Sequence, residues 1–284
     1  MERILRYVPV WLALVLVPLA GLAATPVAAP AALIAYTSVR GGVPSIFVTT
    51  STGTGQGRLL IPNASWPALS TDGSKLAFVQ GQNICVANFD GSGARPITNH
   101  TTAVQVAHPA FNAAGTGLVF AMKTPTTSFS IMAINLDGSG ETSVTSPGLD
   151  PIFTPDGVNI VFANANTLEM MATNHMGNQI QPAPMLSQAP TSVLRFPAFS
   201  PRTPFEAFTL FQTAGAIPSI CLVSFAGQRQ TTVWETNALQ PAFSADGTHI
   251  AFMQQGDIYM KAIAGGTVTR LTVGGNNAEP VWLK

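Results

Sequence analysis

A twelve-residue segment occurs five times along this chain of 284 residues, and no other feature restricts its fold as strongly. Each copy begins with a proline and ends, eleven residues later, with a phenylalanine. The copies are Pro67–Phe78, Pro109–Phe120, Pro151–Phe162, Pro197–Phe208 and Pro241–Phe252. Their prolines are separated by 42, 42, 46 and 44 residues. Such regular spacing predicts a fold built from similar units of about 42 residues.

Every unit carries the signals of four short strands. In three copies an Asp-Gly pair separates two apolar runs, which predicts a hairpin because glycine tolerates the positive φ of the turn. A third apolar run follows, as at Asn83–Val86, and then a second turn, as at Asp90–Gly93. A fourth run, as at Arg95–Thr98, completes the unit. Four short strands in about 42 residues are typical of a β-propeller blade.

The two ends of the chain predict how the ring is completed. The first unit has a second strand at Ile34–Tyr36 but no inner strand before it, and the missing sequence occurs at Glu279–Trp282. The aromatic residues of the second strands number six: Tyr36, Phe78, Phe120, Phe162, Phe208 and Phe252. We therefore expect an all-β, six-bladed propeller over residues 33–284, with four antiparallel strands per blade. The C-terminal strand closes the ring, which leaves no bare sheet edge between the chain ends.

The repeat resembles that of the TolB-type six-bladed β-propeller family. The best matches are Pro241–Gly247 followed by Asp257–Tyr259, and Pro151–Gly157. The resemblance covers residues 33–284, and it implies the propeller fold and an exported protein more than any particular activity. TolB itself carries an additional α/β domain before the propeller, and we expect that domain to be lacking here. In the fifth blade, Pro201–Pro204 replaces the Asp-Gly turn and Glu206 occupies a position that is usually apolar.

The N-terminal segment indicates export. Arg3 and Arg6 precede an uncharged apolar run over residues 8–24, which is typical of a signal peptide. We expect residues 1–24 to be a signal peptide, with an uncleaved membrane anchor as the alternative, and residues 25–32 to be a linker. The propeller would then be periplasmic or extracellular, with no insertion into the membrane if the segment is cleaved.

Composition and motifs indicate little chemistry. Charged residues are 9% of the chain and the net charge is zero, so no basic field would attract a nucleic acid. The chain has no Gly-x-Ser-x-Gly nucleophile motif, and its four histidines lack the spacing of metal ligands. We expect no catalytic residue, metal site or cofactor. A weakly bound Ca²⁺ in the channel remains open if waters or carbonyl groups supply most of its ligands.

Cys85 and Cys221 occupy equivalent third-strand positions in the second and fifth units. These blades face each other across the axis, so the two sulfur atoms are expected to be about 25 Å or more apart, too far for a disulfide. We expect two buried free thiols.

The residues that precede the six inner-strand prolines form a set related by the repeat. They are Trp66, His108, Asp150, Phe196, Gln240 and Glu279, and we call them the ring residues. They are expected to surround one mouth of the channel, where aromatic side chains suit a protein or peptide partner. Packing of Trp66 and Phe196 against a neighbouring blade is the structural alternative. We expect the polar ring residues to be exposed, with Asp150 and Glu279 on opposite sides of the ring.

Two classes of function remain at this point. The first is an exported, monomeric propeller that binds a protein or peptide at the ring residues and catalyses nothing. The second is an enzyme acting on a small molecule or glycan, such as a lactonase, glycosidase or lyase, with its site in the channel. Carboxylates or metal ligands clustered at the axis distinguish the enzyme from the binding protein.

Overall fold

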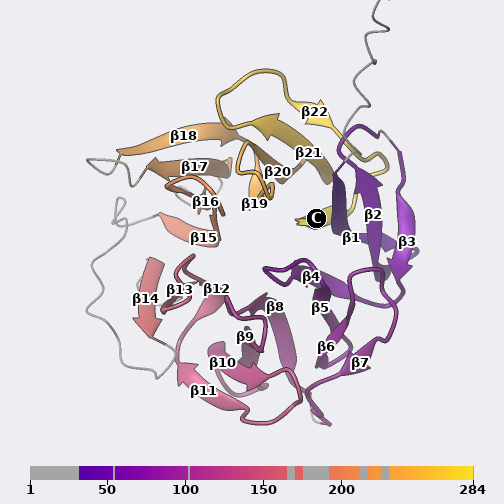
Figure 1. The fold of residues 1–284 in the computed structure, drawn as a ribbon, viewed down its shortest axis with the longest axis vertical. Helices are drawn as coiled ribbons and strands as arrows, with labels where there is room; N and C mark the ends of the chain where they lie inside the picture. Colours follow the sequence, from indigo (N-terminus) through magenta and orange to yellow (C-terminus); the bar gives the residue numbers. More distant parts are fainter. Residues whose placement is uncertain are drawn as a thin grey trace, which may run out of the picture. The chain divides into compact units, whose positions relative to one another are not determined.

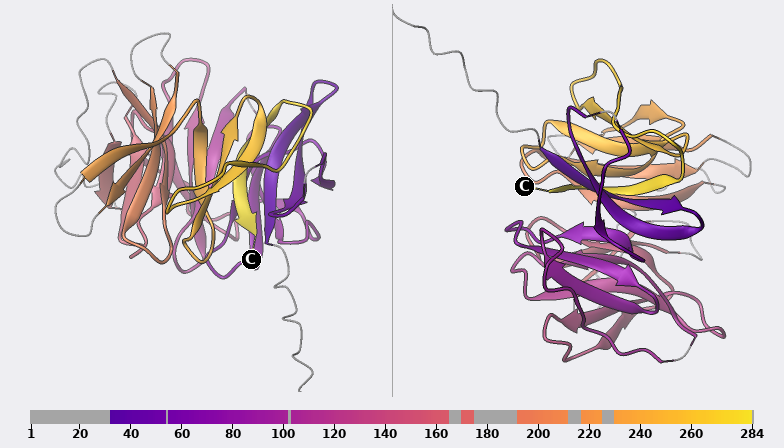
Figure 2. Two further views of the ribbon diagram at one scale, coloured as in Figure 1. Left: turned by 90° about the horizontal axis from the view of Figure 1, so that it is seen from above. Right: turned by 90° about the vertical axis from the view of Figure 1, so that its right-hand side faces the viewer.

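The computed structural model of the chain describes residues 32–53, 55–101, 103–164, 170–174, 192–211, 217–224 and 230–283. Ala31–Lys284 forms one compact unit. The expected signal peptide and nearly all of the expected linker lie outside the described residues. The described elements are β-strands, which group into six antiparallel sheets around a common centre (Figure 1). In the side view the sheets stand next to one another (Figure 2).

Three sheets come from the first half of the chain and its C-terminus. One is ordered β23-β1-β2-β3, and these strands span Asn277–Leu283, Leu33–Arg40, Val43–Thr50 and Arg58–Ile61. The next holds β4 (Ser65–Leu69), β5 (Lys75–Gln80), β6 (Asn83–Asn88) and β7 (Arg95–Pro96). The third holds β8 (Gln105–Phe111), β9 (Gly117–Lys123), β10 (Ser130–Asn135) and β11 (Thr142–Thr145).

The other three sheets follow in sequence order. The first of them holds β12 (Leu149–Phe153), β13 (Asn159–Ala163) and β14 (Met170–Asn174). The second holds β15 (Val193–Phe199), β16 (Phe205–Phe211), β17 (Ser219–Ser224) and β18 (Gln230–Thr236). The last holds β19 (Leu239–Phe243), β20 (His249–Gln254), β21 (Asp257–Ala262) and β22 (Thr269–Arg270).

The number of complete blades corrects the expectation from the sequence. Five sheets have the four antiparallel strands of a propeller blade, whereas six such blades were expected. The sheet of β12, β13 and β14 has three strands among the described residues. Residues 175–191, which follow β14, lie outside the described part.

The C-terminal strand pairs with the first strand of the propeller, as the sequence predicts. In the antiparallel pair of β23 and β1, Trp282 lies opposite Ile34 and Val281 lies opposite Ala35. Trp282 packs between two sheets, against Tyr36 from one and Ile258 from the other. Its indole Nε1 also donates a hydrogen bond of 2.9 Å to the carbonyl of Ala242. Trp282 therefore joins the first and last repeats of the chain.

The second strand of every sheet supplies the centre of the core. The six repeat aromatics are at most 1% exposed: Tyr36, Phe78, Phe120, Phe162, Phe208 and Phe252. The two cysteines are also buried and free, as expected. Burial raises the pKa of both thiols, Cys85 and Cys221, to about 11. Buried side chains therefore fill the space between the sheets. The repeats differ from one another in the ring residues, at the axis.

Candidate functional site

A bulge in each inner strand places the ring residues. The pairing of the inner strand with its neighbour shifts by one residue at the same point in all six sheets. Each shift includes a ring residue and the proline that follows it. Proline fits this point because a bulged residue need not donate a hydrogen bond to the ladder. The proline that marks each repeat in the sequence therefore marks a bulge in the structure.

All six ring residues have a left-handed backbone. Their φ angles lie between 51° and 58°, although none of them is glycine. A residue with a side chain pays roughly 1–2 kcal/mol in this region, so the surrounding structure must hold it there. A bulge redirects the side chain of the bulged residue. Each ring side chain lines the same central cavity.

Hydrogen bonds from one blade to the next hold four of these bulges. The backbone N–H of Phe196 donates to Asp150 Oδ2 at 3.0 Å, and that of Glu279 donates to Gln240 Oε1 at 3.0 Å. The N–H of Trp66 donates to Glu279 Oε2 at 2.7 Å. The N–H of the fourth residue, Gln240, donates to a threonine hydroxyl instead. Three polar ring residues therefore secure the backbone of the next ring residue along the circle.

The aromatic ring residues form one cluster across the axis. The ring centroids of Trp66 and His108 lie 3.7 Å apart, and those of His108 and Phe196 lie 5.8 Å apart. Trp66 and Phe196 stack at 6.4 Å with an angle of 21° between their planes. They come from the second and fifth repeats, so the contact crosses the circle. The contact of Trp66 with His108 of the adjacent sheet agrees with the alternative of packing against a neighbouring blade, whereas the stack of Trp66 on Phe196 across the circle was not anticipated.

Asp150 is the most strongly bound member of the set. It is 4% exposed and accepts hydrogen bonds from Arg195 through Nε and, at 3.0 Å, through Nη2. His108 Nδ1 lies 3.0 Å from its Oδ1. Burial by itself raises the pKa of Asp150, but His108 and Arg195 outweigh this effect and hold the pKa well below its usual range. The expectation of an exposed carboxylate is wrong, because Asp150 is needed to pair Arg195 and to hold the bulge of Phe196.

Glu279 has a different environment. Its Oε2 accepts hydrogen bonds from the Thr37 hydroxyl at 2.5 Å and from the Trp66 N–H at 2.7 Å. Burial raises the pKa of Glu279, and these two donors together with the nearby His108 offset the increase only in part. His108 lowers the pKa of both carboxyl groups, so one imidazole influences Asp150 and Glu279 together.

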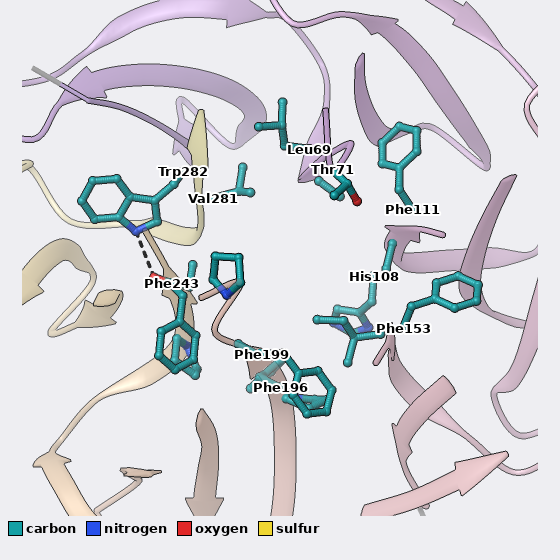
Figure 3. A pocket seen from close by; sticks show the side chains of 18 of the residues that line it. Leu69, Thr71, His108, Phe111, Phe153, Phe196, Phe199, Phe243, Val281 and Trp282 are labelled. Carbon is teal, nitrogen blue, oxygen red and sulfur yellow. Dashed lines mark hydrogen bonds between the residues drawn. The ribbon is translucent and has the colours of Figure 1, made fainter. Parts of the chain in front are cut away.

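The cavity extends from the ring residues to the first hairpin turn of each repeat. Its volume is about 910 Å³, at the upper end of the range for ligand sites. The residue two positions after each inner proline also lines it, and this second set is Leu69, Phe111, Phe153, Phe199, Phe243 and Trp282. Figure 3 shows these six side chains around the cavity, with His108 and Phe196 among them. The walls between the two ends are mainly apolar and aromatic. Polar side chains line the cavity at the ring residues and again near the turns, where Thr71, Ser200 and Arg202 lie.

Three supporting residues were missed by the sequence analysis. Arg195 stands two positions before an inner proline, where the other repeats have uncharged residues. Thr37 and Thr209 directly follow the buried aromatic of the second strand, where the other four repeats have Val, Ala or Met. The Thr209 hydroxyl accepts a hydrogen bond from Gln240 N–H at 3.1 Å, as Thr37 does from Trp66 N–H at 3.2 Å. Polar departures from the repeat were therefore a usable signal.

Neither metal nor membrane features are evident in the described part of the chain. Within residues 32–283, apart from the undescribed gaps, no three His, Cys, Asp or Glu side chains group in a way that could hold a metal ion. The same residues include no apolar helix of membrane-spanning length.

Comparison with solved structures identifies the fold. TolB from Acinetobacter baumannii superposes with a TM-score of 0.72 at 16% sequence identity, over 89% of this chain and 66% of that one. The fold is that of a TolB-type β-propeller. This chain thus spans slightly less than two thirds of that protein's length. Neither a protein-family model nor a curated protein sequence matches the chain.

Two other solved structures that match the chain come from proteins of different kinds. An oligogalacturonate lyase from Vibrio parahaemolyticus has a TM-score of 0.56 at 11% identity, over 83% of this chain and 73% of that one. A propeller from a nidogen/laminin complex has a TM-score of 0.66 at 9% identity, over 89% and 98% of the two chains. At these identities the likeness shows the fold alone.

Proposed function

We propose that this chain is an exported propeller that binds a segment of a protein or peptide in its central cavity without catalysing a reaction. The ring residues Trp66, His108, Asp150, Phe196, Gln240 and Glu279 form the floor of the binding site. The observation that carries the proposal is that both carboxylates already serve the fold. Asp150 and Glu279 each accept a backbone N–H from the next bulge and come from separate sheets, on β12 and β23, whereas a glycosidase needs two carboxyl groups placed as a pair on either side of the scissile bond.

The aromatic content of the cavity supports a macromolecular partner. Buried aromatic side chains in a depression are frequent anchors of protein interfaces. A chain with this fold comes from a nidogen/laminin complex. A cavity of about 910 Å³ with apolar walls suits a short segment of polypeptide entering from the side of the hairpin turns.

The proposal includes a six-bladed closed ring and a location outside the cytoplasm. The pairing of β23 with β1 and the lining of one cavity by six inner strands support closure, with β12–β14 as part of the sixth blade. The apolar N-terminal run with its two arginines supports export. N-terminal sequencing of protein recovered from its host should begin near residue 24 or 25, and an intact Met1 on membrane-bound material would favour the anchor.

A capture experiment tests the binding function. We expect Trp66→Ala and Phe196→Ala each to weaken partner capture from an envelope extract by about 2 kcal/mol or more, which is typical of interface anchors. Phe89→Ala is the matched control, because Phe89 is 45% exposed and does not line the cavity. Circular dichroism should show the same fold in all three variants. Equal loss of capture in the control, or no loss in the cavity variants, contradicts the proposal.

An enzyme with its site in the same cavity is the second candidate. The neighbouring fold of oligogalacturonate lyase and the contact of His108 with Asp150 favour it, because a carboxylate can orient an imidazole for proton transfer. This candidate predicts turnover of an oligogalacturonate, glycan, lactone or ester by the purified protein. If the wild type shows this turnover and His108→Gln lacks it, the protein is an enzyme and the proposal of binding without catalysis is wrong.

A further inference from the structure

One carboxyl group at the floor of the cavity, that of Glu279, has no Lys or Arg paired with it among the described residues. Asp150 is paired with Arg195, whereas Glu279 accepts hydrogen bonds from two neutral donors, the Thr37 hydroxyl and the Trp66 N–H. An ionised carboxylate in such surroundings is costly unless a proton or a cation compensates it.

His108 adds a polar atom beside this carboxyl group. Its side chain is 11% exposed, Nδ1 lies 3.0 Å from a carboxylate oxygen of Asp150, and Nε2 has no hydrogen-bond partner among the described residues. In the tautomer with the proton on Nδ1, that proton faces Asp150 and Nε2 is an acceptor. The floor therefore presents Nε2 of His108 and the carboxyl group of Glu279 to a donor from a ligand.

Aromatic faces lie next to these acceptors. Trp66 and Phe196 stack 6.4 Å apart, and both line the cavity with Glu279. Phe196 already makes one cation–π contact, because the guanidinium carbon of Arg195 lies 4.9 Å from its ring centroid. Tryptophan is the aromatic side chain that attracts a cation most strongly, and the attraction rises when both groups are removed from water.

We infer that the bound partner places a basic side chain, lysine or arginine, against the floor of the cavity, where Glu279 and His108 accept its hydrogen bonds and Trp66 and Phe196 contact its charge. This inference rests on the proposed binding function and specifies the chemistry of the partner. The aliphatic stem of the basic residue lies along the apolar walls, which include Phe153 and Phe199. The ligand thereby brings a cation to Glu279, which has no Lys or Arg partner among the described residues.

Calorimetry with short capped peptides tests the inference on the full chain. The probes are acetyl-Ala-Ala-X-Ala-Ala-amide with X as lysine, arginine, norleucine or glutamate. Norleucine keeps the aliphatic stem of lysine and removes the charge. We expect lysine or arginine to bind at least about tenfold more tightly than norleucine, and glutamate to bind most weakly. This comparison needs no variant, so it stands even if a substitution disturbs folding.

Two variants assign the preference to the cavity floor. Glu279→Gln removes the charge while its amide oxygen can still accept from Thr37 and Trp66, and it should reduce the preference to about threefold or less. Glu141→Gln is the control, because Glu141 carries the same charge in an ion pair with His100 and does not line the cavity. That variant should keep the full preference.

Three results overturn the inference. The first of them leaves the proposed binding function standing. If norleucine binds as tightly as the basic residues, the cavity binds peptides but does not select a cation. If the preference for lysine or arginine survives in Glu279→Gln, another part of the protein recognises the charge of the peptide. If none of the four peptides binds at about 1 mM, the floor is not a site for a basic side chain. The binding function itself is judged separately, by partner capture with Trp66→Ala and its control.

Discussion

Replacing Trp282 by alanine should destabilise the propeller more than any other single truncation in the last strand. Trp282 is 8% exposed and belongs to a cluster that includes Tyr36 and Phe47 from the first sheet and Ile258 from the last. Truncating a buried Trp to Ala costs about 3–5 kcal/mol. The loss of its hydrogen bond to the Ala242 carbonyl adds about 1 kcal/mol.

Urea denaturation followed by circular dichroism measures this effect. We expect the free energy of unfolding to fall by about 4 kcal/mol or more in Trp282→Ala, with the midpoint shifted and the slope m unchanged. Leu59→Ala serves as the control because Leu59, on β3 at the sheet edge, is 47% exposed and should change stability by about 0.5 kcal/mol or less. A loss below about 1 kcal/mol in Trp282→Ala would refute the view that the C-terminal strand joins the first and last repeats.

Two further predictions follow from buried ionisable groups. The folded-state pKa of Asp150 lies below its unfolded value of about 4, so its ionised form stabilises the fold above that pH and this contribution is lost as the pH falls further. Asp150→Asn should therefore be less stable at pH 7 and lose less stability between about pH 4 and 2 than the wild type does; parallel stability curves would contradict this. Cys85 and Cys221 should resist a thiol reagent such as dithionitrobenzoate in native buffer at pH 8, because burial excludes the reagent and raises both thiol pKa values to about 11. Both should react in urea, and rapid labelling of the native protein would show that the core opens readily.

Local patterns predicted the elements of this fold because each hairpin is encoded within one repeat. The Asp-Gly turns, the alternation of short apolar runs and the six aromatics of the second strands all act over a dozen residues. The pairing of Pro280–Trp282 with Ile34–Tyr36 was also predictable from the repeat. The first unit has no inner strand of its own, and the sequence of an inner strand occurs once more at the C-terminal end. The fifth blade keeps its four strands although Pro201–Pro204 replaces the Asp-Gly turn, and the sheet of β12, β13 and β14 has three strands among the described residues.

The positions of the ring residues were predictable, but their surroundings were not. The prolines align the six positions in sequence, and the bulges then bring all six side chains to one cavity. The sequence gives no measure of how far each left-handed residue reaches toward the axis. Exposure was therefore predicted wrongly for Asp150, whose partner Arg195 is 45 residues further along the chain.

The sequence by itself determined the repeating unit, the strands within it and the residues that face the axis, because these depend on turns and periodicity between near neighbours. The tertiary structure alone decided the contacts between sheets: the stack of Trp66 on Phe196 across the axis, the pairing of Asp150 with Arg195 from the next sheet, and the position of Glu279 beside neutral donors. Such contacts depend on which side chains share one small volume after six sheets have packed around it. No local periodicity encodes that volume, so the chemistry of the cavity floor emerges only when the blades are assembled.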